Sequence, residues 1–153
     1  MEDERKFLAE WITHFLKSRD MIFRTLESID RHEQYDLRVK HKNKEQFVIA
    51  EPIFRAEILG KLKQDKHFIL IGFHTEENFQ FILANWKQLA SFPNLTIYTI
   101  NPLSEPDKKW VISPYVHQRI CDAASLKAGL RAMYETVIPL SQEKIKSLIK
   151  QKE

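Results

Sequence analysis

The chain has 153 residues, of which 43% are hydrophobic and 29% are charged, and this balance is typical of one globular domain rather than a disordered segment. Its three glycines, Gly60, Gly72 and Gly129, lie too far apart to form a dinucleotide-binding or P-loop motif. The single cysteine, Cys121, excludes an internal disulfide and a paired-thiolate zinc site, and the net charge of +3 is too small to predict nucleic-acid binding by itself.

The N-terminal residues are acidic and lack the basic-then-apolar layout of a signal peptide. The apolar runs are far shorter than the roughly 18 residues that a membrane span needs. Together with the single cysteine, these features predict a cytoplasmic protein without membrane contact. No motif predicts a cofactor or a metal ion, because no His, Asp or Glu residues have the spacing of a known metal site.

Residues 2–30 contain neither glycine nor proline, and their apolar side chains recur every three or four residues. The pattern predicts one long amphipathic helix, with Ser18 as the candidate break. The apolar stripe comprises Phe7, Leu8, Trp11, Phe15, Ile22, Leu26 and Ile29. So wide a stripe needs a partner surface, which is the sheet, another helix or the same helix of a second copy. We expect a homodimer through this helix.

The next segment changes its period. Apolar and charged residues alternate over residues 35–40, a polar turn follows at 41–45, and residues 46–50 are again largely apolar. This predicts a β-hairpin, which Pro52 ends because proline has no amide hydrogen to donate. A short helix is expected over residues 53–63.

The remaining segments predict alternating strands and helices. Strands are expected at 67–73, 95–100 and 110–113, and helices from Thr75 to about 92, from Asp122 to about 137, and from Ser141 onward. A strand-helix-strand unit implies a parallel pair. We therefore predict one α/β domain over residues 1–153, with a mixed, mostly parallel sheet, helices on both faces and a long N-terminal helix.

Polar residues follow the predicted strands. His74 and Thr75 come after one strand, Asn101 after the next, and Tyr115 and His117 after the third. Ligands of open α/β sheets bind outside the carboxyl ends of parallel strands, so these five residues are candidates for a small-molecule or anion site. The alternative is that they are caps and turn residues, which polar side chains also supply at strand ends.

The hairpin, YDLRVKHKNKEQFVIAEP, resembles that of the restriction-endonuclease-like family, the PD-(D/E)xK nucleases. That family has a helix, three strands, a helix and a strand, and its paired carboxylates bind magnesium beside a lysine that assists the attacking water. Asp36 matches the aspartate and Glu51 the glutamate, but Ile53 stands at the lysine position. The resemblance therefore implies an inactive or non-standard member that can still bind nucleic acid.

Three functions remain open from the sequence. The first is a non-catalytic binding or interaction protein. The second is a ligand-binding protein that uses the strand-end residues. The third is a nuclease-like protein that binds nucleic acid through Asp36 and Glu51 without the catalytic lysine.

Overall fold

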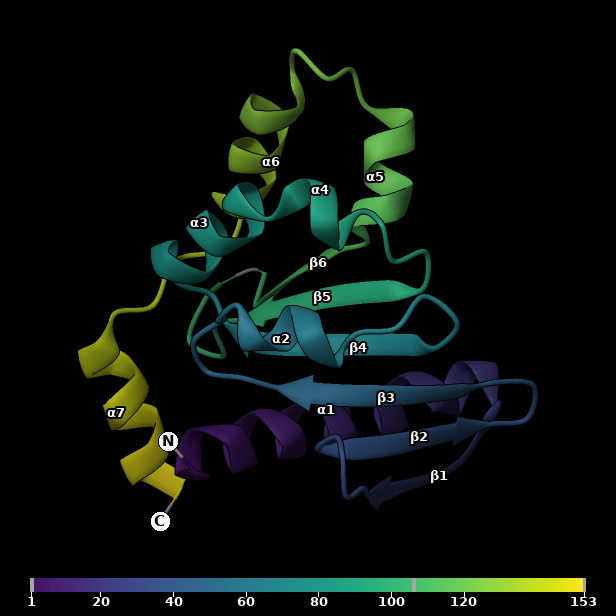
Figure 1. Ribbon diagram of the computed structural model, residues 1–153. Coiled ribbons are helices and arrows are strands. Elements are labelled where there is room, and N and C mark those ends of the chain that lie inside the picture. The colour runs from purple at the N-terminus through teal and green to yellow at the C-terminus, as the bar shows by residue number, and fades with distance from the viewer. Residues whose placement is uncertain (1, 106, 153) are drawn as a thin grey trace.

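The computed structural model describes residues 2–105 and 107–152. Its centre is a six-stranded sheet whose strands lie side by side in chain order (Figure 1). The strands are β1 Leu26–Arg31, β2 Leu37–His41, β3 Glu45–Ala50, β4 His67–Phe73, β5 Leu95–Ile100 and β6 Lys109–Ile112.

The sheet is mixed, but it is not mostly parallel. β3, β4 and β5 are parallel neighbours, whereas the pairs β1–β2, β2–β3 and β5–β6 are antiparallel. The α/β class and the parallel β4–β5 pair are confirmed. The mostly parallel sheet is a wrong prediction, because strands at both sides of the sheet return through short connections, which join only antiparallel strands.

Helices cover both faces of the sheet (Figure 1). One face packs against α1 Glu2–Phe23 and α7 Gln142–Lys152, and the other against α2 Glu57–Lys61, α3 Glu76–Ala84, α4 Trp86–Leu89 and α6 Leu126–Tyr134. Each face therefore buries its own apolar core. The strands between them are apolar on both sides, as in β4, where Phe68 and Leu70 face one core and Ile69 and Ile71 the other.

The long N-terminal helix is confirmed only as far as Phe23. Arg24 has a left-handed backbone (φ 53°), and the Asp20 carboxylate accepts hydrogen bonds from the amides of Thr25 and Leu26 at 2.7 and 2.8 Å. This turn starts β1, in which Leu26 and Ile29 lie. The prediction failed here because the three-residue spacing of Leu26 and Ile29 fits a helical turn. In the structure both pack on the same core because the strand has an irregularity between Leu26 and Ser28.

The other helices differ from the predicted ones mainly at their ends. Asn85 divides the predicted helix after Thr75 into α3 and α4, and α2 is shorter than expected. The helix α5, Pro114–Ile120, was not predicted. Proline at its first position fits a helix start, because the first helical amides have no partner within the helix.

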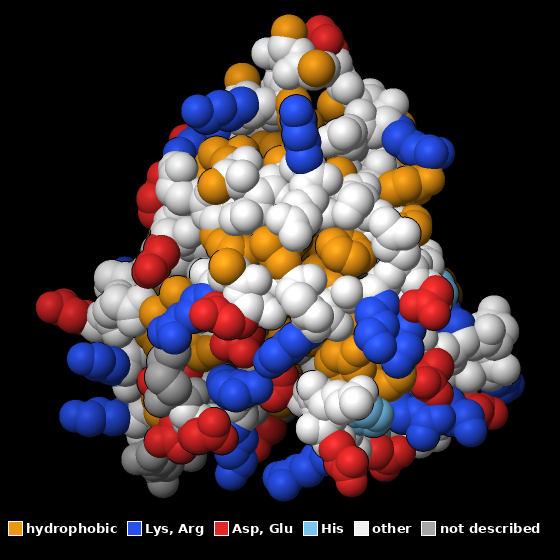
Figure 2. All heavy atoms as spheres, in the orientation of Figure 1, with side chains coloured by type: hydrophobic (Ala, Val, Ile, Leu, Met, Phe, Trp, Pro, Cys, Tyr) orange, Lys and Arg blue, Asp and Glu red, His pale blue; other side chains and the backbone are white. Residues whose placement is uncertain are grey.

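No helix in the described part of the chain has the length and apolar character needed to cross a membrane. On the face shown in Figure 2, positive and negative side chains are interspersed over the lower part of the molecule, around β1, β2 and α7.

Candidate functional site

The antiparallel β2–β3 pair brings Asp36 and Glu51 to one edge of the sheet. Asp36 immediately precedes β2 and Glu51 immediately follows β3, so both stand beside the carboxyl end of β3. The Asp36 amide donates to the Val48 carbonyl at 2.9 Å, and the Ala50 amide donates to Asp36 Oδ2 at 2.8 Å. The aspartate is thus fixed at the strand end by the hairpin itself.

Glu51 is held by the neighbouring strand. Its amide donates to the Ile71 carbonyl at 2.9 Å, and its backbone lies directly against Gly72. A Cβ at Gly72 would stand 2.7 Å from the Glu51 carbonyl oxygen and 2.4 Å from the Phe54 ring. Glycine is therefore required at this point of β4, because the segment that follows β3 crosses the strand there at close contact.

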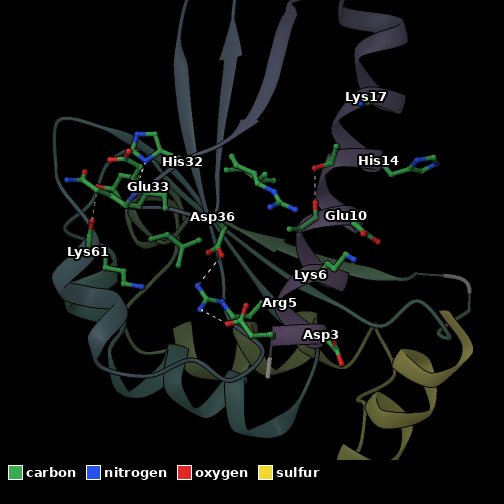
Figure 3. A pocket seen from close by; sticks show the side chains of 18 residues that line it. Asp3, Arg5, Lys6, Glu10, His14, Lys17, His32, Glu33, Asp36 and Lys61 are labelled. Atoms are coloured by element: carbon green, nitrogen blue, oxygen red, sulfur yellow. Dashed lines mark hydrogen bonds and ion pairs between the residues drawn. The ribbon is translucent and has the colours of Figure 1, made fainter. Parts of the chain in front are cut away.

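Arg5 of α1 reaches both carboxylates, and Figure 3 shows its contact with Asp36. Its Nε donates to the Ala50 carbonyl at 3.2 Å, and its Nη2 lies 3.0 Å from Asp36 Oδ1 and 3.9 Å from Glu51 Oε1. The Arg5, Asp36 and Glu51 side chains are 33%, 20% and 19% exposed, so this ion pair is partly shielded from water. The guanidinium supplies the positive charge that two neighbouring carboxylates need.

A second cation approaches from α2. Lys61 Nζ lies 3.9 Å from Glu51 Oε1, and its side chain is 41% exposed. Arg5 and Lys61 therefore contact the same glutamate. The resemblance implied a lysine at position 53, where the chain has isoleucine, and Lys61 is the ammonium group that the fold places beside Glu51.

Arg5, Asp36 and Lys61 line a groove of about 810 Å³ between α1 and the β1–β2 connection (Figure 3). Its wall contains acidic and basic side chains in equal number, together with His14 and His32. The acidic residues are Glu2, Asp3, Glu10, Glu33 and Asp36, and the basic ones are Arg5, Lys6, Lys17, Arg31 and Lys61. The groove is thus strongly polar but has no net charge with neutral histidines.

No group of three or more His, Cys, Asp or Glu side chains suited to a metal ion occurs in residues 2–105 and 107–152. At the edge of the sheet, Arg5 contacts both Asp36 and Glu51. A divalent cation would have to displace the guanidinium to bind both Asp36 and Glu51.

The strand-end residue His74 is fully buried and both its ring nitrogens have partners. Nε2 lies 2.8 Å from the Tyr134 carbonyl, which can only accept, so Nε2 is the donor. Nδ1 then accepts from the Thr99 hydroxyl at 2.7 Å. Burial lowers the pKa of His74, which keeps the ring neutral in this arrangement.

Thr75 and Asn101 also have partners within the protein. Thr75 caps α3 by accepting from the Asn78 amide at 3.1 Å. Asn101 Nδ2 donates to the Ile138 carbonyl at 2.6 Å, and Asn101 Oδ1 accepts from the Leu103 amide at 2.9 Å. These are the cap and turn roles that formed the alternative to a ligand site, and a ligand would have to break the bonds they make.

One segment covers the ends of β4 and β5. Residues 134–140, which we call the covering segment, connect α6 to α7 and bond to the ends of β4 and β5. The Leu140 amide donates to the His74 carbonyl at 2.7 Å, and the Ile138 amide donates to Ser104 Oγ at 3.1 Å. The helix before the segment, α6, is joined to α3 by a bidentate Arg131–Glu76 ion pair, which lowers the pKa of Glu76 to about 2.

Tyr115 and His117 lie on α5 and contact other neighbours. Arg119 covers the Tyr115 ring at 4.3 Å, and the His117 ring meets Trp86 edge-on at 6.0 Å. His117 Nε2 is also 3.2 Å from Cys121 Sγ, and partial burial lowers the pKa of His117. His74 instead packs against Trp110 and Tyr134. The structure therefore brings His74, Thr75 and Asn101 to one edge, and places Tyr115 and His117 against different side chains.

The two cations that contact Glu51, Arg5 and Lys61, were not among the sequence-based candidates. Arg5 lies three residues before Leu8 and therefore on the same helix face. This was a weak signal that its side chain lies near the sheet. Comparison of the chain with protein-family models, with curated proteins and with solved structures finds no match.

Proposed function

We propose that this chain is a non-catalytic binding protein that holds a phosphodiester of nucleic acid in the groove between α1 and the β1–β2 connection. The observation on which this rests is the position of Arg5, whose guanidinium stands between Asp36 and Glu51. In the family that the hairpin resembles, the corresponding carboxylates bind magnesium. Here an arginine supplies the positive charge, and an arginine cannot activate water as a metal ion does.

The order of elements supports the proposal. A helix, three strands, a helix and a strand is the order of that family, and α1, β1, β2, β3, α2 and β4 follow each other in the same order. Asp36 and Glu51 occupy neighbouring strand ends, as the matched carboxylates do. The isoleucine at position 53 supports the non-catalytic form of the proposal, because it has no amine to assist a water molecule.

Phosphate recognition would use Arg5 and Lys61. A guanidinium donates to two phosphate oxygens at once, and an ammonium adds a second positive charge nearby. The acidic residues of the groove offset part of this attraction, so we expect modest affinity. Because phosphate contacts release bound counterions, we also expect affinity to fall steeply with salt.

The test is fluorescence polarisation with labelled single-stranded DNA, double-stranded DNA and RNA at low and moderate salt, with and without magnesium. We expect salt-dependent binding, no cleavage, and weaker binding by Arg5→Ala and Lys61→Ala. Lys127→Ala, an exposed lysine of α6, is the matched control and should bind as the wild type does. Absence of binding at low salt, or binding insensitive to salt, would contradict the proposal.

A second candidate is metal-dependent cleavage with Lys61 in the place of the missing lysine. It is favoured by the 3.9 Å distance between Lys61 Nζ and Glu51 Oε1. In this case magnesium would displace Arg5, and Asp36→Ala, Glu51→Ala and Lys61→Ala would each abolish cleavage. Cleavage that survives Asp36→Ala would refute these roles.

We also propose a homodimer, with contact through the C-terminal end of α1 instead of its apolar stripe. The buried stripe of α1, formed by Phe7, Leu8, Ile12 and Leu16, packs on the sheet of its own chain and is not available to a second copy. Its C-terminal end is accessible for contact, because Met21, Ile22 and Phe23 are exposed.

The cytoplasmic location expected from the single cysteine stays a prediction.

A further inference from the structure

A second groove lies on the face of the sheet opposite to α1, between α3, α4 and the start of α6 (Figure 1). Its volume of about 340 Å³ is enough for a small organic ligand. Trp86 and Leu130 are buried, whereas Leu83 and Leu126 are only partly buried, so apolar surface remains in contact with water. We call it the apolar groove because most of its lining residues are apolar. These are Leu83, Ala84, Trp86, Ala123, Leu126 and Leu130.

Lys127 is the one charged side chain among the described residues that line the apolar groove. It is exposed, and its ammonium group forms no ion pair or hydrogen bond within residues 2–105 and 107–152. Gln80, the other polar residue of the lining, donates to Glu76 at 3.1 Å. Arg131 already holds Glu76 in a bidentate ion pair. Lys127 is therefore a positive charge that no acid of the described chain compensates, and it stands beside an apolar surface.

The position of Lys127 in its helix adds to this charge. Lys127 is the second residue of α6, and the N-terminus of a helix carries a partial positive charge that favours acidic residues and disfavours lysine. The first turn of α6 has no acidic residue, and the N-cap Ser125 makes no side-chain cap hydrogen bond to the described residues. Asp122, which precedes the helix, accepts from the Ala124 amide at 3.2 Å. An anion beside Lys127 would relieve the unfavourable charge and pair with the ammonium group.

We propose that the apolar groove binds a small carboxylate with an apolar body, with the carboxylate beside Lys127 and the body against Trp86 and its apolar neighbours. Burial of methylene groups supplies most of the affinity. The exposed ion pair adds less and orients the ligand. The proposal does not depend on nucleic-acid binding, because Arg5 and Lys61 do not line this groove.

The test is a nuclear magnetic resonance titration of the nitrogen-15-labelled protein with octanoate, which follows the indole signals of the three tryptophans. We expect the Trp86 signal to shift most, because Trp11 and Trp110 do not line the apolar groove. Hexanoate, which is two methylene groups shorter, should bind about tenfold more weakly. Acetate has no apolar body and should leave the Trp86 signal in place. An octanoate titration that leaves the Trp86 signal unshifted would overturn the proposal.

Three variants test the two halves of the ligand. Lys127→Gln should weaken octanoate about fivefold and leave 1-octanol unchanged, because only the ion pair is lost. Lys87→Gln, at an exposed lysine of α4 outside the lining, is the matched control and should bind as the wild type does. Ala84→Phe fills the groove from an exposed position, so both ligands should lose binding while circular dichroism shows an unchanged fold. Wild-type affinity for octanoate in Lys127→Gln or in Ala84→Phe would contradict the proposal. Nucleic-acid binding by Lys127→Gln separates this outcome from failure of the other groove, because Lys127 lines only the apolar one.

Discussion

The carboxyl edge of the sheet has two halves, and in both of them polar residues follow the strands. Only the half at β4 and β5 is covered by the segment of residues 134–140. At the ends of β4 and β5, His74 Nε2 and Asn101 Nδ2 donate to carbonyls of the covering segment. At the end of β3, Asp36 lines a groove, and cations from α1 and α2 contact Asp36 and Glu51. A polar residue after a strand therefore indicates a site only where no later segment of the chain returns to cover it.

The largest expected effect on stability comes from replacing His74, which lies under the covering segment. His74→Ala removes the donor to the Tyr134 carbonyl and the acceptor for the Thr99 hydroxyl, and leaves a cavity in a fully buried place. We expect a loss of about 3 kcal/mol in the free energy of unfolding. Urea denaturation measures it, and His117→Ala on the partly exposed α5 should cost about 0.5 kcal/mol. Equal losses for both variants would show that the covering segment is not held through His74.

The next effect comes from the close contact behind Glu51. Gly72→Ala forces a methyl group against the Phe54 ring and the Glu51 carbonyl, so we expect about 2 kcal/mol of destabilisation and a displaced Glu51. The control is Gly60→Ala in α2, where a Cβ meets nothing within 4 Å. That change should stabilise the protein by about 0.5 kcal/mol, because alanine favours a helix. Thermal unfolding distinguishes the two, and a stable Gly72→Ala would mean that the segment after β3 can move aside.

The stability that His74 contributes to the covered half should depend on pH. Burial lowers the pKa of His74 below its ordinary value of 6.5, so the unfolded chain takes up this proton at higher pH than the folded one. The contribution of the neutral ring to stability is therefore complete above pH 6.5 and is lost as the pH falls below it. Denaturation of the wild type and of His74→Gln at several pH values checks this. The wild type should lose more stability between neutral and mildly acidic pH than the variant does.

The smallest effect on stability is expected at the open half. Arg5→Met removes a partly exposed ion pair, and we expect a loss of no more than about 1 kcal/mol. Its effect on nucleic-acid binding should be much larger than its effect on unfolding, because Arg5 is the cation between the two carboxylates. A variant that is strongly destabilised but binds normally would make Arg5 a structural residue rather than a binding one.

The parts of the fold that were predicted correctly have local causes. The boundaries of β4 and β5 matched because β4 is a largely apolar run, β5 is rich in β-branched residues, and both are followed by polar residues. The hairpin matched because alternation changes to a polar turn and back. β1 was missed because Leu26 and Ile29 continue the helical spacing, and they share a face of the strand only through the irregularity between Leu26 and Ser28. The turn at Arg24 depends on a backbone conformation that residue types specify only weakly.

Of the candidate site, the sequence analysis named only the two hairpin residues. Asp36 and Glu51 belong to one supersecondary unit, so their proximity follows from the hairpin register. Arg5 is 31 residues from Asp36, and their contact depends on where α1 crosses the sheet. Likewise, nothing in the residues around His74 indicated that the Tyr134 carbonyl, 60 residues later, would occupy its ring nitrogen. Such contacts are set by tertiary packing, which a single sequence does not display.

The position of α7 has a consequence for how the chain matures during synthesis. The face of the sheet that α1 covers is completed by Leu140, Ile145 and Leu148, which the ribosome makes after all six strands. Until those residues emerge, part of this apolar face is open to water and to other nascent chains. Because α7 is made after the sheet that it covers, we expect an interruption of translation before it to leave part of this apolar face exposed.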